Sequence, residues 1–341
     1  MTNRFPDSSL IPLFEFLKVS RRIVITTHHK PDGDAMGSSL GLYHYLIKRG
    51  HQVSVITPSD YPGFLYWLPS NEKVINYEFQ QTVAKPLIEN AELLFCLDFN
   101  SLRRVETMEN ELRNSNAKKV LIDHHLDPEP VFDFSFSYAD ACSTCELIYD
   151  FILALKDTGL VDKSIAECLY CGIMTDTNSF RYSSMKAETH RTVAALIEAG
   201  AENAKIHEMV YDHNTENRLR LLGYALKDKL KVLPEYNTAY LSLSESELKG
   251  FNFKSGDTEG FVNYALSIEG IKVAAFFNEK DGMIKISFRS KGDFSVKDMS
   301  AQYFEGGGHK NASGGRSLLS LEETEIRFIE ILKKYKSELT S

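Results

Sequence analysis

Short apolar runs that end in aspartate or histidine recur along the first half of the chain, and they restrict its fold more than any other feature. Arg22–Thr27 has the length and composition of a buried strand and leads into a segment rich in histidine and aspartate. Glu92–Leu97 is likewise followed by Asp98, and Lys119–Ile122 by Asp123. Because helix-like segments separate these runs, the sequence predicts an α/β fold whose N-terminal part is a doubly wound, mostly parallel sheet.

The length of the chain and the change of pattern along it indicate two domains. At 341 residues, the chain is longer than a typical single domain. Residues 1–190 carry the alternating strand and helix pattern, residues 191–231 are compatible with a charged helical connector, and residues 232–341 show strand patterns again. We therefore predict a catalytic domain, a helical connector and a smaller mixed α/β domain.

Composition and charge exclude several classes of protein. The 43% hydrophobic and 25% charged residues are typical of a globular enzyme. The longest apolar runs are too short to span a bilayer and the first residues lack the features of a secretory signal, so we expect a cytoplasmic protein without a membrane partner. A net charge of −8 argues against stable binding of long DNA or RNA. The assembly state stays open, with a homodimer as one alternative.

Four of the five cysteines form two C-x2-C pairs, a spacing that zinc sites also use. The four residues are Cys142, Cys145, Cys168 and Cys171. Both pairs adjoin apolar residues, and residues three apart share one face of a helix. The pattern therefore favours packing of small side chains in the core, with a structural zinc site as the alternative.

The densest group of ionisable residues directly follows the first predicted strand. His28, Asp32 and Asp34 lie in a loop that Pro31 and Gly33 bend, so their side chains can converge. The ends of neighbouring parallel strands meet at one edge of a sheet, and we expect further acidic and imidazole groups to join them there. These are Asp98, Asp123, His124, His125 and Asp176, the last of which follows the apolar segment Gly172–Thr175.

Each of these elements alone has a structural explanation, since a single aspartate at a strand end is often a turn former or a helix cap. Four such elements at successive strand ends are better explained by bound cations, because unpaired buried carboxylates are poorly tolerated. Mixed carboxylate and imidazole ligands suit Mn²⁺, Mg²⁺ or Fe²⁺. The sequence therefore predicts a metal centre at this edge of the sheet.

A second constellation lies near the C-terminus, where Gly306–Gly315 contains five glycines in ten residues. Glycine lets successive backbone N–H groups point at an anion, and His309 and Lys310 would add side-chain donors. Arg289 and Lys291 end the strand pattern that precedes this loop. We predict a site for substrate phosphate here, with a flexible loop that binds no ligand as the alternative.

Together, these motifs resemble the DHH phosphoesterase superfamily, in its subfamily with a DHHA1-type C-terminal domain. The resemblance covers nearly the whole chain and rests on the Asp123-His124-His125 triplet, on His28-x-x-Pro31-Asp32-x-Asp34, on Asp98, on Asp176 and on the loop Gly306–Ala312. Within the family, the two-domain layout is most similar to the nano-RNases, which degrade very short RNA and dephosphorylate 3′-phosphoadenosine 5′-phosphate (pAp). The chain departs from the pattern at Asn178, where many relatives have glycine.

The resemblance implies a centre of two divalent ions, with Mn²⁺ preferred and Mg²⁺, Co²⁺ or Fe²⁺ as alternatives. The first ion would be held by His28, Asp32 and Asp98. The second ion would be held by Asp34, Asp98, His124 and Asp176. Asp98 would therefore bridge the two ions.

The resemblance also implies roles around the ions. Asp123 would orient the histidines and His125 would face the phosphate. The second domain would hold substrate phosphate or sugar through Arg289, Gly307, Gly308 and His309. Further candidates for phosphate contacts are Arg103 and Arg181.

The function implied is hydrolysis of oligoribonucleotides of a few nucleotides to mononucleotides, together with dephosphorylation of pAp. The alternatives are a phosphodiesterase for linear or cyclic dinucleotides of the pApA type, and a non-catalytic sensor of metal or nucleotide. A pyrophosphatase or polyphosphatase is disfavoured by the triple-glycine loop, which those relatives lack. A single-strand exonuclease of the RecJ type is disfavoured by the acidic charge.

Overall fold

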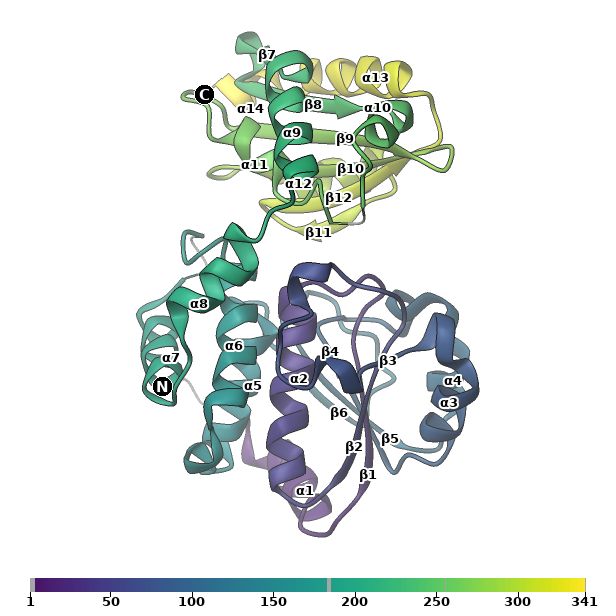
Figure 1. Cartoon of the computed structure of the whole chain (residues 1–341), viewed down its shortest axis with the longest axis vertical. Coiled ribbons are helices and arrows are strands. Elements are labelled where there is room, and N and C mark those ends of the chain that lie inside the picture. Colours follow the sequence, from purple (N-terminus) through teal and green to yellow (C-terminus); the bar gives the residue numbers. More distant parts are fainter. Residues whose placement is uncertain (1–3, 183–184, 255, 341) are drawn as a thin grey trace. The chain divides into compact units, whose positions relative to one another are not determined.

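The computed structural model describes residues 4–182, 185–254 and 256–340. Contacts between residues divide the chain into Met1–His213 and Asn214–Ser341, which we name unit 1 and unit 2. Each unit contains one sheet with helices packed against it (Figure 1). The boundary between the units falls inside the segment for which a helical connector is predicted.

Unit 1 contains a sheet of six parallel strands. The strands are β1 (Arg22–Thr26), β2 (Gln52–Thr57), β3 (Ile75–Asn76), β4 (Leu93–Leu97), β5 (Lys118–Asp123) and β6 (Phe134–Ser137). Their order, β3-β2-β1-β4-β5-β6, reverses between β1 and β4, so the prediction of a doubly wound parallel sheet is confirmed. Sheets of this kind bind ligands beyond the carboxyl ends of the strands at the point of reversal.

Helices cover both faces of this sheet (Figure 1). They are α1 (Asp7–Phe16), α2 (Gly33–Lys48), α3 (Tyr77–Glu89), α4 (Glu109–Asn114), α5 (Thr144–Ala154), α6 (Lys163–Asp176), α7 (Ala187–Glu198) and α8 (Asn203–His207). Shorter 3₁₀ turns lie at Gly63–Leu65, Asn71–Lys73, Leu102–Met108 and Thr158–Leu160, and a π-helical turn lies at Glu208–Asp212. None of the helices within the described ranges combines the length and apolar composition needed to cross a bilayer.

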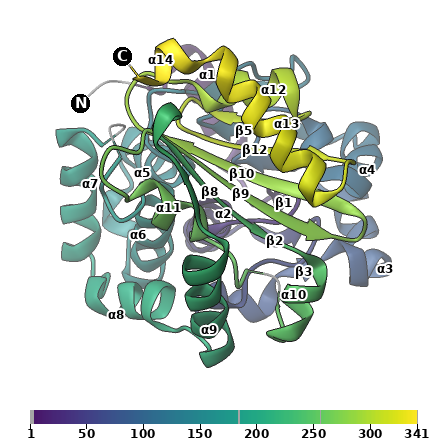
Figure 2. The same cartoon turned by 90° about the horizontal axis from the view of Figure 1, so that it is seen from above.

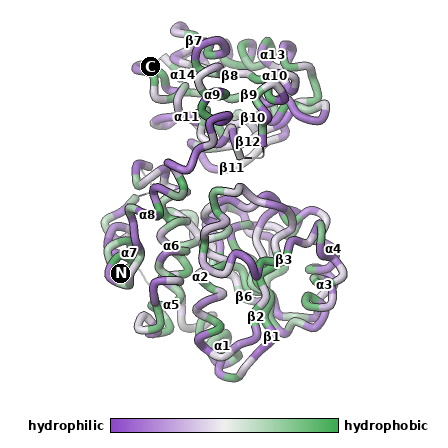
Figure 3. Tube along the Cα trace, in the orientation of Figure 1, coloured by the Kyte–Doolittle hydropathy of each residue, from purple (hydrophilic) through white to green (hydrophobic). Residues whose placement is uncertain are grey.

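The alternation of side chains along each strand explains why both faces of the sheet are covered. In β1, Ile23 and Ile25 belong to an apolar core that also contains residues of α1, α2, α5 and α6. Val24 belongs to a second core with residues of α3 and α4. Every residue of β4 is buried, as expected for a central strand between two layers of helices. The hydrophobic stretches of these elements are visible in Figure 3.

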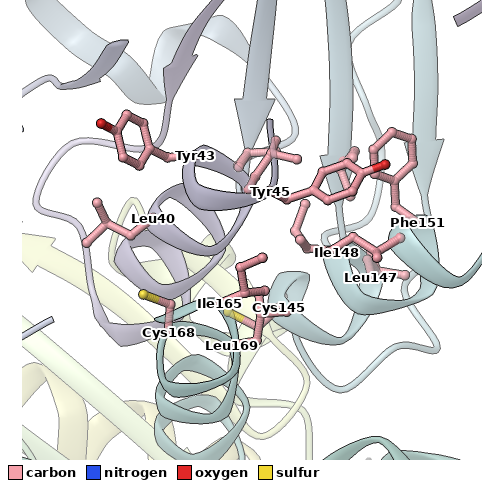
Figure 4. Close-up of a cluster of buried hydrophobic side chains, with 14 of the residues drawn as sticks. Leu40, Tyr43, Tyr45, Cys145, Leu147, Ile148, Phe151, Ile165, Cys168 and Leu169 are labelled. Carbon is pink, nitrogen blue, oxygen red and sulfur yellow. The ribbon is translucent and has the colours of Figure 1, made fainter. Parts of the chain in front are cut away.

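The four cysteines of the two C-x2-C motifs lie in the core that contains residues of α1, α2, α5 and α6. Figure 4 shows Cys145 and Cys168 among apolar side chains that include Leu40, Ile148 and Leu169. All five cysteines of the chain are free and buried. Burial raises the pKa of the Cys145 and Cys168 thiols well above the usual value, so these residues pack as small apolar side chains.

Helices α2 and α6 approach each other closely through glycines. A Cβ atom added to Gly37 of α2 would lie 2.5 Å from the carbonyl oxygen of Cys168. A Cβ atom added to Gly172 of α6 would lie 2.2 Å from Cys145 Sγ and 2.9 Å from Asp34 Oδ1. Because these glycines have no side chain, the acidic start of α2 can lie next to the end of α6.

Unit 2 contains a mixed sheet in the order β11-β12-β10-β9-β8-β7. The strands are β7 (Lys231–Leu233), β8 (Thr238–Leu243), β9 (Val273–Lys280), β10 (Met283–Ser290), β11 (Gly307–His309) and β12 (Ala312–Ser317). Strands β8 and β9 are parallel, and the other neighbours are antiparallel. The prediction of a smaller, mixed α/β domain is therefore confirmed.

The helices of unit 2 also form two layers. They are α9 (Glu216–Tyr224), α10 (Glu245–Gly250), α11 (Phe261–Leu266), α12 (Val296–Tyr303), α13 (Leu321–Lys334) and α14 (Lys336–Thr340), with a π-helical turn at Ala225–Lys229 and a 3₁₀ turn at Pro234–Tyr236. One core joins Phe277 and Phe288 to Phe328 of α13, and Figure 2 shows α13 running along the sheet. The other core joins Phe276 to residues of α9, α10 and α11.

The glycine-rich segment of unit 2 differs from its prediction. It is predicted as a loop, but Gly307–His309 and Ala312–Ser317 form an antiparallel hairpin at the edge of the sheet. Glycine is unfavourable in strands and gives no strand signal in a sequence, which explains why the sequence predicts a loop here. The backbone N–H groups here are therefore partly engaged in strand pairing.

Candidate metal centre

The loop after β1 places the first group of candidate ligands. His28 follows the strand, and Asp32 caps α2, because its Oδ1 accepts hydrogen bonds from the backbone N–H groups of Asp34 (3.0 Å) and Ala35 (3.1 Å). Aspartate is a preferred N-cap residue for this reason. The cap fixes the start of α2, so Asp34 in its first turn is buried against the rest of the unit.

Asp98 lies directly after β4, at the point where the strand order reverses. Its backbone has a φ of 63°, the left-handed conformation that aspartate tolerates better than most residues. Its N–H donates to the carbonyl oxygen of Ile122 in β5. The turn therefore begins at once, and the carboxylate lies beyond the strand end and 2% exposed.

Asp176 lies at the same centre, but it is positioned by a different element from the one predicted. It is expected at a strand end, but the structure makes it the last residue of α6. Residues 165–174 of this helix are all buried, and a run buried on every side cannot be assigned to helix or strand by periodicity. The residue is still brought to the centre, as the distances below show.

The first group consists of His28, Asp32 and Asp98, whose ligand atoms lie within 4.8 Å of one another. His28 Nε2 is 3.5 Å from Asp98 Oδ2 and 3.9 Å from Asp32 Oδ2. Its other ring nitrogen is 2.9 Å from the carbonyl oxygen of His29, which fixes the orientation of the ring. A metal-binding histidine is commonly held in this way.

The second group consists of Asp34, His124 and Asp176. His124 Nε2 is 3.6 Å from Asp176 Oδ2 and 3.8 Å from Asp34 Oδ2. The same nitrogen is 3.4 Å from Asp98 Oδ1. Asp98 therefore turns Oδ2 toward the first group and Oδ1 toward the second, which is the arrangement a bridging carboxylate needs.

Asp123 and His125, the other two residues of the Asp123-His124-His125 triplet, lie beside these groups. His125 Nδ1 is 2.7 Å from Asp123 Oδ1, and Asp123 is completely buried at the end of β5. A carboxylate in this position selects the ring tautomer that carries its hydrogen on Nδ1 and makes Nε2 the basic nitrogen. The geometry therefore suits Asp123 to orienting His125.

The electrostatics of the centre are unfavourable without cations. Burial, together with the nearby Asp98 and Asp176, raises the pKa of Asp34 well above its usual value. Burial also raises the pKa of Asp176 to about 6. For Asp98, burial acts in the same direction, but contacts with His124 and His28 outweigh it and hold its pKa well below the usual range. Divalent ions would offset this crowding of negative charge.

The donor set fits a pair of divalent cations. Carboxylate oxygens and imidazole nitrogens converge in two groups that share Asp98. The nearest thiol, that of Cys145, contacts the backbone oxygen of Asp34 at 3.5 Å instead of turning to the ligand atoms. The ligand types are those of Mn²⁺, Fe²⁺ and Mg²⁺ sites and not of a thiolate zinc site.

The two arginines on the turn after β4 differ in their exposure and in their surroundings. Arg103 is exposed on the 3₁₀ turn after β4. Burial lowers the pKa of His28, but contacts with Asp98 and Asp32 outweigh it, so the pKa is raised overall. The neighbouring Arg104, for which the sequence makes no prediction, has a smaller effect that opposes this rise. Its carbonyl oxygen also accepts the N–H of His29 at 2.7 Å. Two adjacent arginines give no signal in the sequence that would distinguish them.

Asn178, the departure from the family pattern, has a φ of 50°. This left-handed conformation explains why glycine is suitable in relatives and why asparagine can replace it. The side chain of Arg181 folds back onto this residue, with Nε donating to the Asn178 carbonyl oxygen and Nη2 to Asn178 Oδ1. The bond to Asn178 Oδ1 depends on an amide side chain that glycine lacks, whereas the bond to the carbonyl oxygen does not.

The candidate substrate residues of unit 2 lie together on neighbouring strands. Arg289 of β10 is opposite Ala312 of β12, which is in turn opposite His309 of β11. Directly opposed residues share one face of a sheet, so Arg289 and His309 lie on either side of a small alanine. Arg289 Nε is buried without a hydrogen-bond partner among the described residues, so this donor is available to bind a ligand. Gly308 has a φ of 137°.

This fold and this centre define a class of enzyme, the metal-dependent phosphoesterases with a DHH domain. The chain belongs to the DHH family: the N-terminal domain of that family matches residues 22–173, and the DHHA1 domain matches residues 236–339. The resemblance carried by the motifs is therefore confirmed.

Individual relatives narrow the class further. The bifunctional oligoribonuclease and PAP phosphatase NrnA of Bacillus subtilis is 28% identical over 307 residues, which are 89% of this chain and 91% of the relative. The protein of the same name from Thermus thermophilus is 29% identical over 322 residues, 94% and 92% of the two chains. The crystal structure of an exopolyphosphatase-related protein from Bacteroides fragilis is 39% identical, with a TM-score of 0.96 over 100% of both chains.

Proposed function

We propose that this protein is a two-metal phosphoesterase that hydrolyses short oligoribonucleotides to mononucleotides and dephosphorylates pAp. The observation that carries the proposal is the sharing of Asp98, whose two oxygens face two separate groups of ligands at 3.4 and 3.5 Å. The ions would lower the pKa of a coordinated water and neutralise charge on the phosphoryl oxygens. We propose Mn²⁺ as the ion, because the mixed oxygen and nitrogen donors suit it.

The residues of the chain would position the substrate and handle its charge. His125, oriented by Asp123 at 2.7 Å, would meet the phosphoryl oxygens and stabilise the charge that develops on them. Neither a serine nor a cysteine nucleophile is required, which agrees with the inert, buried thiols of this unit. Arg289 and His309 would bind phosphate or sugar of the substrate.

The substrate class is supported by the names of the curated relatives, which describe both an oligoribonuclease and a PAP phosphatase. The similar region covers 91% and 92% of the length of these two relatives, so it includes both domains. The net charge of −8 suits short substrates better than long nucleic acid. We further propose that the enzyme acts in the cytoplasm, where such products of RNA decay arise.

The test is a comparison of substrates at equal concentration with the Mn²⁺-loaded full chain. Dinucleotide RNA, a long single-stranded RNA, pAp, linear pApA and a short polyphosphate would be assayed by chromatography of the products. We expect the highest kcat/KM for dinucleotide RNA and measurable release of phosphate from pAp. Faster turnover of polyphosphate than of any nucleotide would refute the substrate assignment while leaving the metal centre intact.

A further inference from the structure

Thr144 is the first residue of α5 and is fully buried between the two groups of metal ligands. The helix is capped by the residue before it, because Ser143 Oγ accepts the N–H of Glu146 at 3.1 Å. Thr144 is therefore not needed as the cap, and its own polar atoms are directed elsewhere.

Those atoms contact one carboxylate of each group. The backbone N–H of Thr144 donates to Asp34 Oδ2 at 2.6 Å, and its hydroxyl donates to Asp98 Oδ1 at 3.0 Å. The next N–H along the helix, that of Cys145, donates to Asp34 Oδ1 at 2.9 Å. Both oxygens of Asp34 and one oxygen of Asp98 are thus fixed by a single helical turn.

This turn is itself held rigidly. Glu146, one turn into the helix, is 2% exposed and accepts hydrogen bonds from the N–H of Cys142 at 3.0 Å and from Thr189 Oγ1 at 2.6 Å. The guanidinium of Arg4 lies 3.2 Å from the same carboxylate. Buried hydrogen bonds to charged groups are strong and directional, so the start of α5 is a fixed support.

We propose that Thr144 is a positioning residue that sets the spacing between Asp34 and Asp98, and thereby the affinity of the centre for its ions. The inference rests on the proposed metal centre. Its physical basis is that two neighbouring carboxylates repel each other, and one residue that donates a separate hydrogen bond to each of them holds both in the orientation that the ions require. Hydrogen bonds behind metal ligands tune metal affinity in this way.

The hydroxyl is the part of this support that a substitution can remove without altering the backbone. Thr144→Val has nearly the same shape and keeps the N–H to Asp34, but it has no donor for Asp98. Thr144→Ser keeps both donors. Binding of Mn²⁺ to the metal-free full chain would be measured by calorimetry, and the coupling between two bound Mn²⁺ ions by electron paramagnetic resonance.

We expect T144V to bind Mn²⁺ about 10-fold or more weakly, since loss of such partners typically costs about 10–100-fold, and to show a changed coupling signal. T144S is expected to bind as the wild type does. The matched control is Thr324→Val in unit 2, which removes another buried hydroxyl (2.9 Å from Ser317 Oγ) far from any ligand in the sequence. This control is expected to leave Mn²⁺ binding unchanged.

Wild-type affinity in T144V, or an equal loss in T144S, would overturn the inference. If T144V does not fold by circular dichroism, T144A takes its place under the same criteria. Failure of the wild type itself to bind Mn²⁺ would instead refute the proposed metal centre, so the two failures are distinguishable.

Discussion

The two units hold their candidate functional residues in opposite ways. In unit 1, Asp34 and Asp98 are 1% and 2% exposed and accept hydrogen bonds from α5. In unit 2, Gly307 and Gly308 lie exposed on a three-residue strand at the edge of the sheet. Under the proposed function, the metal centre would rest on buried, hydrogen-bonded carboxylates, whereas the substrate would be bound by an exposed surface. Substitutions in the two units should therefore fail in different ways.

The largest effect is expected for Asp98→Ala in unit 1. The substitution removes a carboxylate from both groups at once, so kcat for dinucleotide RNA should fall by more than the about 100-fold that outer hydrogen-bond partners cost. Calorimetry should show that tight Mn²⁺ binding is lost. Full activity in this variant, with Mn²⁺ bound as in the wild type, would contradict the bridging role.

A smaller effect is expected where α6 meets α5 and the start of α2. In Gly172→Ala, the new methyl group would lie 2.2 Å from Cys145 Sγ, and overpacking of this kind costs about 1–3 kcal/mol. The displaced helix would also carry Asp176 with it, so activity should fall together with the free energy of unfolding. Urea denaturation and steady-state kinetics would measure both.

The control for this variant is Gly223→Ala in α9, where no atom lies within 4 Å of the added methyl group. Alanine is the better helix former by about 0.5–1 kcal/mol, so this control should be as stable as the wild type or slightly more so, with unchanged activity. A destabilised Gly223→Ala and a neutral Gly172→Ala would show that the close contact of α6 with α5 and the start of α2 is unimportant.

Substitutions in unit 2 should weaken substrate binding and leave metal binding unchanged. Arg289→Ala removes a guanidinium from the proposed phosphate site, and we expect KM for pAp to rise about 10-fold, the equivalent of one ordinary charge-assisted hydrogen bond. Calorimetry should show unchanged Mn²⁺ binding. Lys249→Ala provides a control, because this lysine is 73% exposed on α10 and pairs with Glu245. A fall in metal affinity in Arg289→Ala would contradict the assignment of metal binding to unit 1 and substrate binding to unit 2.

The smallest effect is expected at Asn178. Replacement by glycine relieves the left-handed conformation but removes the side-chain contact with Arg181, the hydrogen bond to Asn178 Oδ1. Glycine also adds disorder to the unfolded chain, so the free energy of unfolding should change by less than about 1 kcal/mol. Asn178→Ala keeps the strain and loses the contact, and it should cost about 1 kcal/mol. Urea denaturation of both variants would test this order, which the reverse ranking would contradict.

Much of the fold could be predicted because strands β1, β4 and β5 are buried on both sides and appear in the sequence as short, continuous apolar runs. The convergence of His28, Asp98 and His124 followed from the rule that neighbouring parallel strands end at one edge. Asp176 was misplaced because α6 is buried on all sides and lacks the polar face that marks most helices. Its approach to Asp34 depends on glycines whose role appears only in three dimensions.

Other features could not be derived from local patterns. The hairpin β11–β12 is rich in glycine and has almost no strand propensity, so its pairing is set by tertiary contacts. Thr144 gave no signal, because a threonine at the start of a helix is common whether or not it contacts distant carboxylates. Arg104 and Arg103 are distinguished by their surroundings in the folded chain, where Arg104 is the less exposed of the two and its carbonyl oxygen accepts the N–H of His29.

The two oxygens of Asp98 have a consequence for how the enzyme responds to its surroundings. A carboxylate shared by two sites would already be partly neutralised by the first ion, and the two cations would repel each other, so the second ion should bind more weakly than the first. We expect loading in two steps, with a Hill coefficient of about 1 or less for Mn²⁺ binding. The fully loaded enzyme would then form only in the upper part of the range of free metal, and degradation of short RNA would follow the supply of that ion in the cell.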